Sequence, residues 1–265
     1  MPNLKRNNHY LPECYQKGFT DPSGKTWVKF ASKSEPEHRK PLTVGRKRSL
    51  YIWTQAGAEN DKVENFFNEH VEIPFAALSQ RIKNERHEFA TITNDERGVL
   101  CRFVASQTMR TLAHKAAIQQ QAGKAVDTNT FVRVMLRKII AVLDGWLKNP
   151  PELYFHTPLP YVGEQFITGD NPVLVVQTND NSVWVPTDTP TLKITNVHEI
   201  VTDPKHRLWL SLSPYVCVSI QGFGGGGTHL PPKSEDPVFV RNFNKLIRGQ
   251  SEIFTLAKDK AYLAS

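Results

Sequence analysis

Two short motifs, far apart in the chain, carry the side chains best suited to acid–base chemistry. The first is His9-Tyr10-Leu11-Pro12, in which a histidine precedes a proline that can begin a short helix. Histidine changes its charge near neutral pH, so it is suited to act as a general base. The second is Gly169-Asp170-Asn171-Pro172, where Asp170 could orient a histidine, bind a metal or accept a proton. Taken alone, a packed histidine and an Asx turn in a hairpin explain the two motifs better.

Gln107 and Arg110 form a third candidate because residues three apart lie on one face of a helix. The guanidinium of Arg110 could hold a phosphate with two parallel hydrogen bonds. The amide of Gln107 falls among apolar neighbours and needs polar partners. A pair that braces two helices is the structural alternative. The substrate-binding residues that we predict beside these groups are Tyr10, Tyr51, Asn171, Arg46, Lys47 and Arg48.

The chain is basic, with a formal net charge of +7 and a pI of about 9.3. Such a balance favours a polyanionic partner, which would be nucleic acid, a nucleotide or anionic lipid. The basic residues are spread along the chain, with one local cluster at Arg46-Lys47-Arg48. A solvated surface explains the charge equally well.

The sequence lacks the motifs that are typical of several classes of function. The three cysteines are widely spaced with no C-x-x-C pair, which favours a reducing compartment and predicts neither a zinc site nor a redox site. No secretory signal and no apolar run of membrane-spanning length occurs, so we expect a cytoplasmic protein. No cofactor motif is evident, and the sequence leaves a divalent metal open. Gly224 to Gly227 is predicted to be a flexible loop. The oligomeric state cannot be read from the sequence.

The elements that must position these side chains follow a segregated order. Residues 1–56 are β-rich, residues 57–149 are helical, residues 150–235 are β-rich again, and residues 236–265 close the chain with a helix. This order predicts a single α+β domain, with a helical subdomain packed on a mainly antiparallel sheet from both ends of the chain. The candidate C-terminal strands are 153–155, 165–168, 173–177, 183–185, 208–212 and 216–220.

The helical region has recognisable starts and stops. A capping box at Thr93 and Glu96 predicts a long helix that runs to about Gly123. The apolar spacing from Pro237 to Ala257 predicts the closing helix. On the first long helix, a solvated face is the simpler expectation for the carboxylates Glu64, Glu69 and Glu72.

Together the motifs resemble an uncharacterised bacterial family known as domain of unknown function 4238. The resemblance rests on His9-Tyr10-Leu11-Pro12, on the helix segment 105–111, on the turn at 168–172 and on Leu212-Ser213-Pro214 before a helix with Asn244. It covers most of the chain, although Leu11 replaces a valine and Gly169 replaces a serine. Without that serine hydroxyl, no nucleophile is expected at position 169. The family implies no activity, but it implies that His9, Gln107, Arg110 and Asp170 belong to one recurrent set.

A recurrent set drawn from distant segments favours one shared site. We expect a nuclease-like hydrolase, such as a toxin or a defence effector, that acts on nucleic acid or nucleotides. His9, Asp170, Arg110 and Gln107 would be its catalytic residues, with Arg110 as the phosphate clamp. A non-catalytic module that binds nucleic acid or a nucleotide signal is the alternative. A purely structural role for the motifs is a third.

Overall fold

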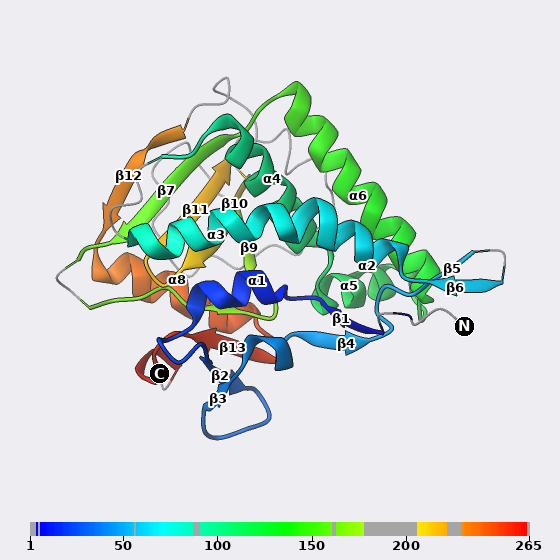
Figure 1. Ribbon diagram of the computed structural model, residues 1–265, viewed down its shortest axis with the longest axis horizontal. Helices are drawn as coiled ribbons and strands as arrows, with labels where there is room; N and C mark the ends of the chain where they lie inside the picture. Colours follow the sequence, from blue (N-terminus) through cyan, green and yellow to red (C-terminus); the bar gives the residue numbers. More distant parts are fainter. Residues whose placement is uncertain are drawn as a thin grey trace.

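Helices and strands occupy separate stretches of the chain. The computed structural model describes residue 4 and residues 6–55, 57–86, 91–160, 163–177, 206–221 and 229–263. Their arrangement is the predicted α+β fold (Figure 1). The candidate strand 183–185 and the Gly224 to Gly227 loop lie outside the described residues. Within the described residues, no helix is both long and apolar enough to cross a bilayer.

The elements follow the predicted order with one shift. The N-terminal part contains β1 (Asn7–His9), α1 (Glu13–Gln16), η1 (Lys17–Phe19), β2 (Thr26–Phe30), β3 (Glu37–Arg39), η2 (Pro41–Thr43), β4 (Arg46–Arg48), β5 (Trp53–Gln55) and β6 (Ala58–Asn60). The helical part contains α2 (Lys62–Phe67), η3 (Asn68–Glu72), α3 (Ile73–Glu85), α4 (Asn94–Met109), α5 (Leu112–Ala122) and α6 (Thr128–Lys148). It begins after residue 60 rather than at 57, because β6 pairs with β5 in a hairpin.

The C-terminal part supplies most of the sheet structure. It contains β7 (Glu152–Pro158), β8 (Thr168–Gly169), β9 (Val173–Gln177), β10 (His206–Ser213), β11 (Val216–Gln221), β12 (His229–Glu235), α8 (Pro237–Gln250), β13 (Phe254–Ala257) and η5 (Lys260–Leu263). One sheet has the order β12-β7-β11-β10-β9 and is antiparallel except for the pair β12–β7. A second has the order β3-β2-β13-β8. The described N-terminal strands β1, β4, β5 and β6 form two further two-stranded sheets. The predicted common sheet is therefore divided, and among the described sheets only the four-stranded one joins both ends of the chain.

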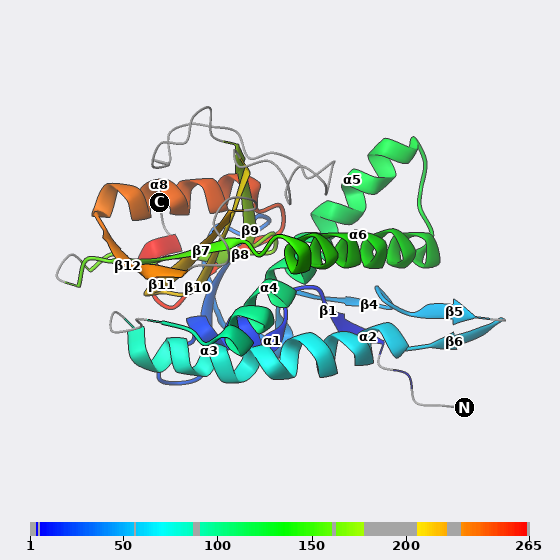
Figure 2. The same ribbon diagram turned by 90° about the horizontal axis from the view of Figure 1, so that it is seen from above.

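The five-stranded sheet is covered by helices on both faces, with α8 on one side and α3 and α4 on the other (Figure 2). Leu208 and Leu210 of β10 belong to the core cluster under α3 and α4, whereas Trp209 belongs to the cluster under α8. This alternation is the two-residue period of a strand that is buried on both faces.

Two C-terminal segments differ from the prediction. The closing helix ends at Gln250, and Phe254–Ala257 forms strand β13 between β2 and β8. A short apolar run fits a helix or a buried strand alike, so only pairing decides. The turn at Asp170 is also not a hairpin, because β8 pairs with β13 while β9 pairs with β10. The turn therefore connects the two sheets.

The long helix predicted after Thr93 is broken close to Arg110. Helix α4 ends at Met109, and α5 begins again at Leu112 with the Thr111 side chain as its N-cap. The predicted capping box of α4 is present: Thr93 Oγ1 accepts from the Glu96 amide at 3.2 Å, and the Glu96 carboxylate accepts from the Thr93 amide at 2.8 Å. The break places Arg110 at the end of α4 rather than inside a continuous helix.

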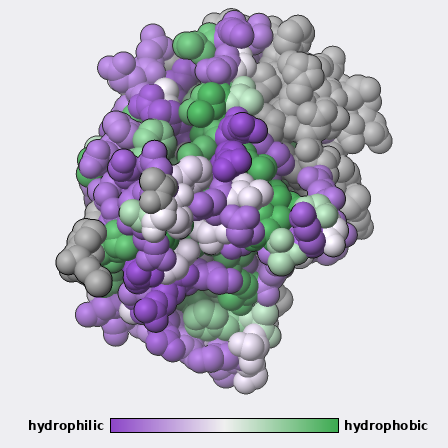
Figure 3. All heavy atoms as spheres, turned by 90° about the vertical axis from the view of Figure 1, so that its right-hand side faces the viewer, coloured by the Kyte–Doolittle hydropathy of each residue, from purple (hydrophilic) through white to green (hydrophobic). Residues whose placement is uncertain are grey.

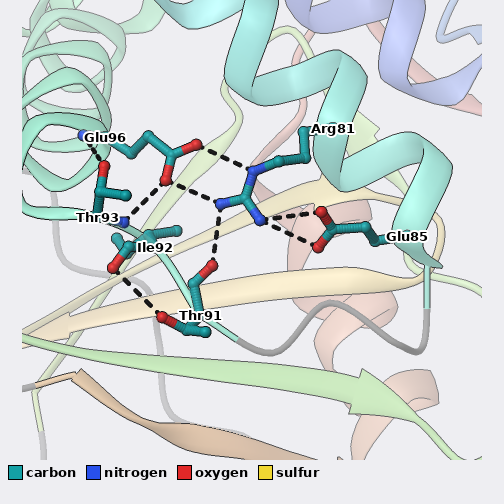
Figure 4. Close-up of polar contacts among 6 residues, drawn as sticks. All are labelled: Arg81, Glu85, Thr91, Ile92, Thr93 and Glu96. Atoms are coloured by element: carbon teal, nitrogen blue, oxygen red, sulfur yellow. Dashed lines mark hydrogen bonds and ion pairs between the residues drawn. The ribbon is translucent and has the colours of Figure 1, made fainter.

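Arg81 ties helix α3 to the start of α4 (Figure 4). Its Nε and Nη2 donate to the two carboxylate oxygens of Glu96 at 3.0 and 2.9 Å, and Nη1 donates to Glu85 at 3.0 Å. Nη2 also donates to the Thr91 carbonyl at 2.9 Å. Bidentate arginine–carboxylate contacts fix orientation as well as distance, so this network sets how α3 lies against α4.

Helices α2 and α3 are joined by a π-helical turn, η3. Pro74 follows directly, and its missing N–H removes one hydrogen bond of the α-helical ladder. Single π-helical turns often occur at functional sites. Here the turn carries Asn68 and Glu72, and both line the candidate site.

Candidate functional site

A polar cavity of about 480 Å³ opens beside His9. Asn7 and His9 of β1 line it together with Asn68 and Glu72 of η3. The other lining residues are Leu4, Arg6, Glu13 and Glu64. Only one of these eight residues is apolar, so the cavity suits a hydrophilic ligand.

The backbone of His9 is held from two sides. On one side the carbonyl of Gly45 accepts from the Tyr10 and Leu11 amides at 2.9 and 3.1 Å. On the other, Nη2 of Arg110 donates to the His9 carbonyl. Gly45 has a φ of +65°, and a Cβ there would lie 2.7 Å from Cβ of Leu11. Only glycine accepts both constraints, so Gly45 is part of what positions His9.

The ring of His9 is oriented by the carbonyl of Leu42, which lies 3.3 Å from Nε2. A carbonyl oxygen only accepts, so Nε2 carries the proton in the neutral ring and Nδ1 has the lone pair. Burial lowers the pKa of His9 below 6.5, against the opposing effects of the Leu42 carbonyl and the Glu72 carboxylate. At neutral pH the ring is therefore neutral and able to accept a proton at Nδ1.

Arg110 lies behind the cavity wall, with 0 % of its surface exposed. Its Nη1 donates to Glu72 Oε1 at 2.8 Å, and its guanidinium lies 4.4 Å from the centre of the Phe67 ring. The hydroxyl of Tyr51 donates to the Arg110 carbonyl at 2.6 Å. The guanidinium is thus enclosed and bonded to protein acceptors, whereas a phosphate clamp requires donors open to the ligand. In this structure Arg110 holds His9 and Glu72 in place.

Two of the cavity carboxylates are paired with cations. Glu72, with 17 % of its side chain exposed, is bound to Arg110, and Glu13 lies 2.8 Å from Lys17. The expectation of a solvated face is therefore wrong for Glu72, because the π-helical turn directs it against a buried arginine. It holds for Glu69, which is exposed.

The basic cluster Arg46-Lys47-Arg48 forms strand β4, which pairs antiparallel with β1. The register sets Arg46 opposite His9 and Arg48 opposite Asn7, and all three basic residues are exposed. Residues directly opposite in an antiparallel pair lie on the same face of the ribbon. Figure 3 shows that this end of the molecule carries mainly hydrophilic residues, with hydrophobic ones between them. Two of the predicted substrate-binding residues, Arg46 and Arg48, thus lie on the same face of the ribbon as the predicted base.

Asp170 is buried, with 3 % exposed, at the connection between the two sheets. Its carboxylate accepts from the amides of Ile253 and Phe254 at 3.2 and 3.3 Å, and its own amide donates to the Phe254 carbonyl at 3.1 Å. Burial raises the pKa of Asp170 to about 6, although the two amide hydrogen bonds favour its charged form. A Cβ at the preceding Gly169 would lie 3.0 Å from the Phe254 carbonyl oxygen, so glycine permits this close approach.

The predicted site residues fall into two groups that meet at Tyr10. His9, Tyr51 and Arg110 gather at the cavity end. Asp170 lies on the other side of Tyr10. Burial raises the pKa of the Tyr10 hydroxyl, and the nearby Asp170 carboxyl raises it further. His9 and Asp170, both within the described residues, share no hydrogen bond. The neighbouring Asn171 is bound elsewhere, since its carbonyl accepts from Gln250 of α8.

Gln107 lies one turn before Arg110 and is 0 % exposed. Neither its amide nitrogen nor its amide oxygen has a hydrogen-bond partner among the described residues. Buried amides are normally satisfied, so Gln107 is an exception among the buried polar side chains that the structure describes.

A second polar cluster has no counterpart in our sequence predictions. Nδ1 of His156 lies 2.8 Å from Glu235 Oε1, and its Nε2 lies 3.0 Å from Ser219 Oγ. The order of contacts is that of a serine–histidine–carboxylate triad. However, Ser219 is 1 % exposed and the His156 ring packs 4.6 Å from that of Trp209. No motif joins these residues, because the pairing of β7 with β11 and β12 alone brings them together.

The described residues contain no group of three or more histidine, cysteine, aspartate or glutamate side chains able to hold a metal ion. Comparison with curated proteins and with solved structures finds no match. A family model described as "Protein of unknown function (DUF4238)" matches residues 7–261, which include β1, the Arg110 helix and the Asp170 turn. The chain therefore belongs to the DUF4238 family.

Proposed function

We propose that this protein hydrolyses a phosphate ester or anhydride bond in a nucleotide or nucleic acid, with His9 as the general base. The observation that carries the proposal is the register of β1 with β4. It sets Arg46 opposite His9 and Arg48 opposite Asn7, and both His9 and Asn7 line the cavity. Directly opposed side chains have Cβ atoms about 4.5–5.5 Å apart, so phosphate-binding cations would stand beside the proton acceptor.

The cavity lining carries three carboxylates, Glu13, Glu64 and Glu72, and the cation Arg6, so an anionic substrate requires that carboxylates be neutralised. The carboxylates of Glu13 and Glu72 are balanced by Lys17 and Arg110, each at 2.8 Å. The exposed arginines of β4 add positive charge that draws an anion towards the cavity. A divalent cation would strengthen phosphate binding further, and we propose it as an optional cofactor to be tested.

The proposed reaction begins with a water molecule in the cavity. Nδ1 of His9 takes its proton as the water oxygen attacks phosphorus. The bond from phosphorus to the leaving oxygen breaks, and that oxygen takes up a proton from the imidazolium or from solvent. Glu72 and Arg110 would position the base. Asp170 and Gln107 are proposed to position the site from behind through Tyr10 and α4.

The proposal is tested with the full chain on single- and double-stranded DNA, RNA and nucleoside triphosphates. Each substrate is assayed with EDTA, with Mg²⁺ and with Mn²⁺. We expect H9Q to lose about 10²–10⁴-fold in rate with an unchanged melting temperature. The acid limb of the wild-type pH–rate profile should lie below 6.5, since the pKa of His9 is lowered.

The matched control is H70Q, which changes an exposed histidine of the same π-helical turn that carries Glu72. It should retain full activity. Equal losses in H9Q and H70Q, or wild-type turnover that survives H9Q, would rule out His9 as the base.

A non-catalytic module that binds nucleic acid or a nucleotide signal is the second candidate, and the exposed basic strand β4 favours it. In that case the wild type binds without turnover, and a R46Q/R48Q double variant weakens binding. For either function we propose a cytoplasmic location, in keeping with the three unbridged cysteines Cys14, Cys101 and Cys217.

A further inference from the structure

A second cavity, of about 310 Å³, lies among residues that the proposed function does not use. Lys83 and Arg86 line it from the end of α3, Lys258 from just after β13, and Tyr215 from the turn between β10 and β11. Thr20 and Asp21 line it from the segment before β2. Basic side chains from two distant segments thus converge on one hollow.

Two of the three cations contact Tyr215, and the third, Lys83, lines the same cavity. Nζ of Lys258 donates to the Tyr215 hydroxyl at 2.7 Å, and the Arg86 guanidinium lies 5.5 Å from the centre of its ring. Nζ of Lys83 donates to Thr20 Oγ1 at 2.6 Å. Burial, and after it the charge of Lys258, lowers the pKa of Lys83; the Asp21 carboxylate opposes this shift and Arg86 adds to it. The cations therefore repel one another, and an anion between them would relieve this repulsion.

The one carboxylate in the cavity lining, Asp21, offsets only part of this positive charge. Asp21 accepts from the hydroxyl and amide of Ser23 at 2.7 and 2.8 Å and bonds to Nε2 of His38 at 2.8 Å. It is thus occupied by its own turn and by β3. Counting Asp21 against Lys83, Arg86 and Lys258, the lining carries a formal charge of +2.

Arg86 adds an independent observation. Its φ is +52° and its ψ is −119°, a backbone conformation that residues other than glycine rarely adopt. Strained backbone of this kind is concentrated at ligand-binding positions. Here the strained residue is the one that brings a guanidinium to the cavity.

We propose that this cavity binds the dianionic phosphate of a phosphomonoester or of inorganic phosphate. A dianion matches the +2 lining, whereas a carboxylate or a phosphodiester carries one negative charge. The guanidinium and the two ammonium groups offer donors for three terminal oxygens, and the volume admits a phosphate with a small organic group. The site is independent of the His9 cavity and of its proposed activity.

Isothermal titration calorimetry with inorganic phosphate, a nucleoside monophosphate and a dinucleotide phosphodiester tests the proposal at constant ionic strength. We expect saturable binding of the first two and at least tenfold weaker binding of the diester. K83M and K258M should each weaken phosphate binding at least tenfold. K148M removes an exposed lysine at the end of α6 and should bind as the wild type does.

R86G is the sharpest variant, because it removes the guanidinium and the backbone strain together. We expect weaker phosphate binding but a melting temperature raised by about 2–4 °C. This gain separates loss of the ligand from loss of the fold. The proposal is wrong if the wild type shows no saturable phosphate binding, or if K83M, K258M and R86G all bind as tightly as K148M.

Discussion

His9 and His156 are both oriented by defined hydrogen bonds, but their surroundings differ in access. His9 bonds to one carbonyl, lines a cavity of about 480 Å³ and has its Nδ1 lone pair available. His156 uses both ring nitrogens on Glu235 and Ser219 and is covered by Trp209. A histidine with both nitrogens satisfied inside a core stabilises the fold, whereas a base needs a free lone pair and a route for substrate.

The comparison shows that a recognisable order of catalytic residue types is not enough to identify an active site. The His156 cluster has the order of contacts of a triad but is buried, and the His9 cavity is open without a recognised triad. The first two changes below test these two regions, and the later ones test residues behind the His9 cavity.

The largest effect is expected from R110M. The change leaves Glu72 without its buried partner and releases the His9 carbonyl. Breaking one side of a buried ion pair destabilises a protein by about 3–5 kcal/mol. Urea denaturation should show this loss, and activity should fall in the protein that remains folded. E72Q, which keeps the shape of the partner, should lose less stability than R110M.

The second-largest effect is expected in the buried cluster of His156, Glu235 and Ser219. H156L removes the partner of the buried Ser219 and leaves Glu235 with Lys233 alone, at 3.3 Å, so we expect a loss of roughly 1–3 kcal/mol in unfolding free energy. Turnover per folded molecule should not change. S219A is the matched test at the other end of the contact chain. If S219A abolishes hydrolysis while the protein stays folded, the His156 cluster is the catalytic one and the comparison is reversed.

Asp170 gives a prediction about pH. Its pKa is about 6 in the folded protein against an ordinary value of 3.8, so the folded state binds this proton more tightly than the unfolded state. Unfolding free energy should therefore fall as pH rises from about 4 to about 6, by on the order of 3 kcal/mol. Other carboxylates, such as Glu96, have a lowered pKa and act in the opposite direction.

The contribution of Asp170 is isolated by comparing D170N with the wild type in urea denaturation at several pH values. The difference in stability between the two should change across this pH range and be constant above it. A difference that is constant from pH 4 to pH 7 would contradict the raised pKa.

The smallest effect is expected at Gln107, whose buried amide has no partner among the described residues. Q107M keeps the volume and removes the unsatisfied atoms, so stability should rise by about 1 kcal/mol. If Gln107 serves the His9 site, Q107M loses activity as it gains stability. A loss of stability instead would mean that the amide is satisfied in solution, for example by a buried water.

The sequence by itself determined the local structure wherever signals were short-range. The helix start at Thr93 rests on a capping box between residues three apart, and the segregated α+β order rests on hydrophobic periodicity. The motif at His9 and the basic cluster at residues 46–48 could be identified as candidate functional residues, because side-chain type alone sets their acid–base and charge properties.

Only the tertiary structure decided what these residues contact. The register of β1 with β4 is fixed by pairing across more than thirty residues, so no local pattern could set Arg46 opposite His9. The role of Arg110 depends on Glu72 being turned against it by a π-helical turn, and strand β13 forms only because β2 and β8 offer it hydrogen bonds. Burial and pairing are properties of the assembled chain. For this reason the sequence could mark His9 and Asp170 as candidates, but only the structure placed His9 at a cavity and Asp170 at the buried connection between the two sheets.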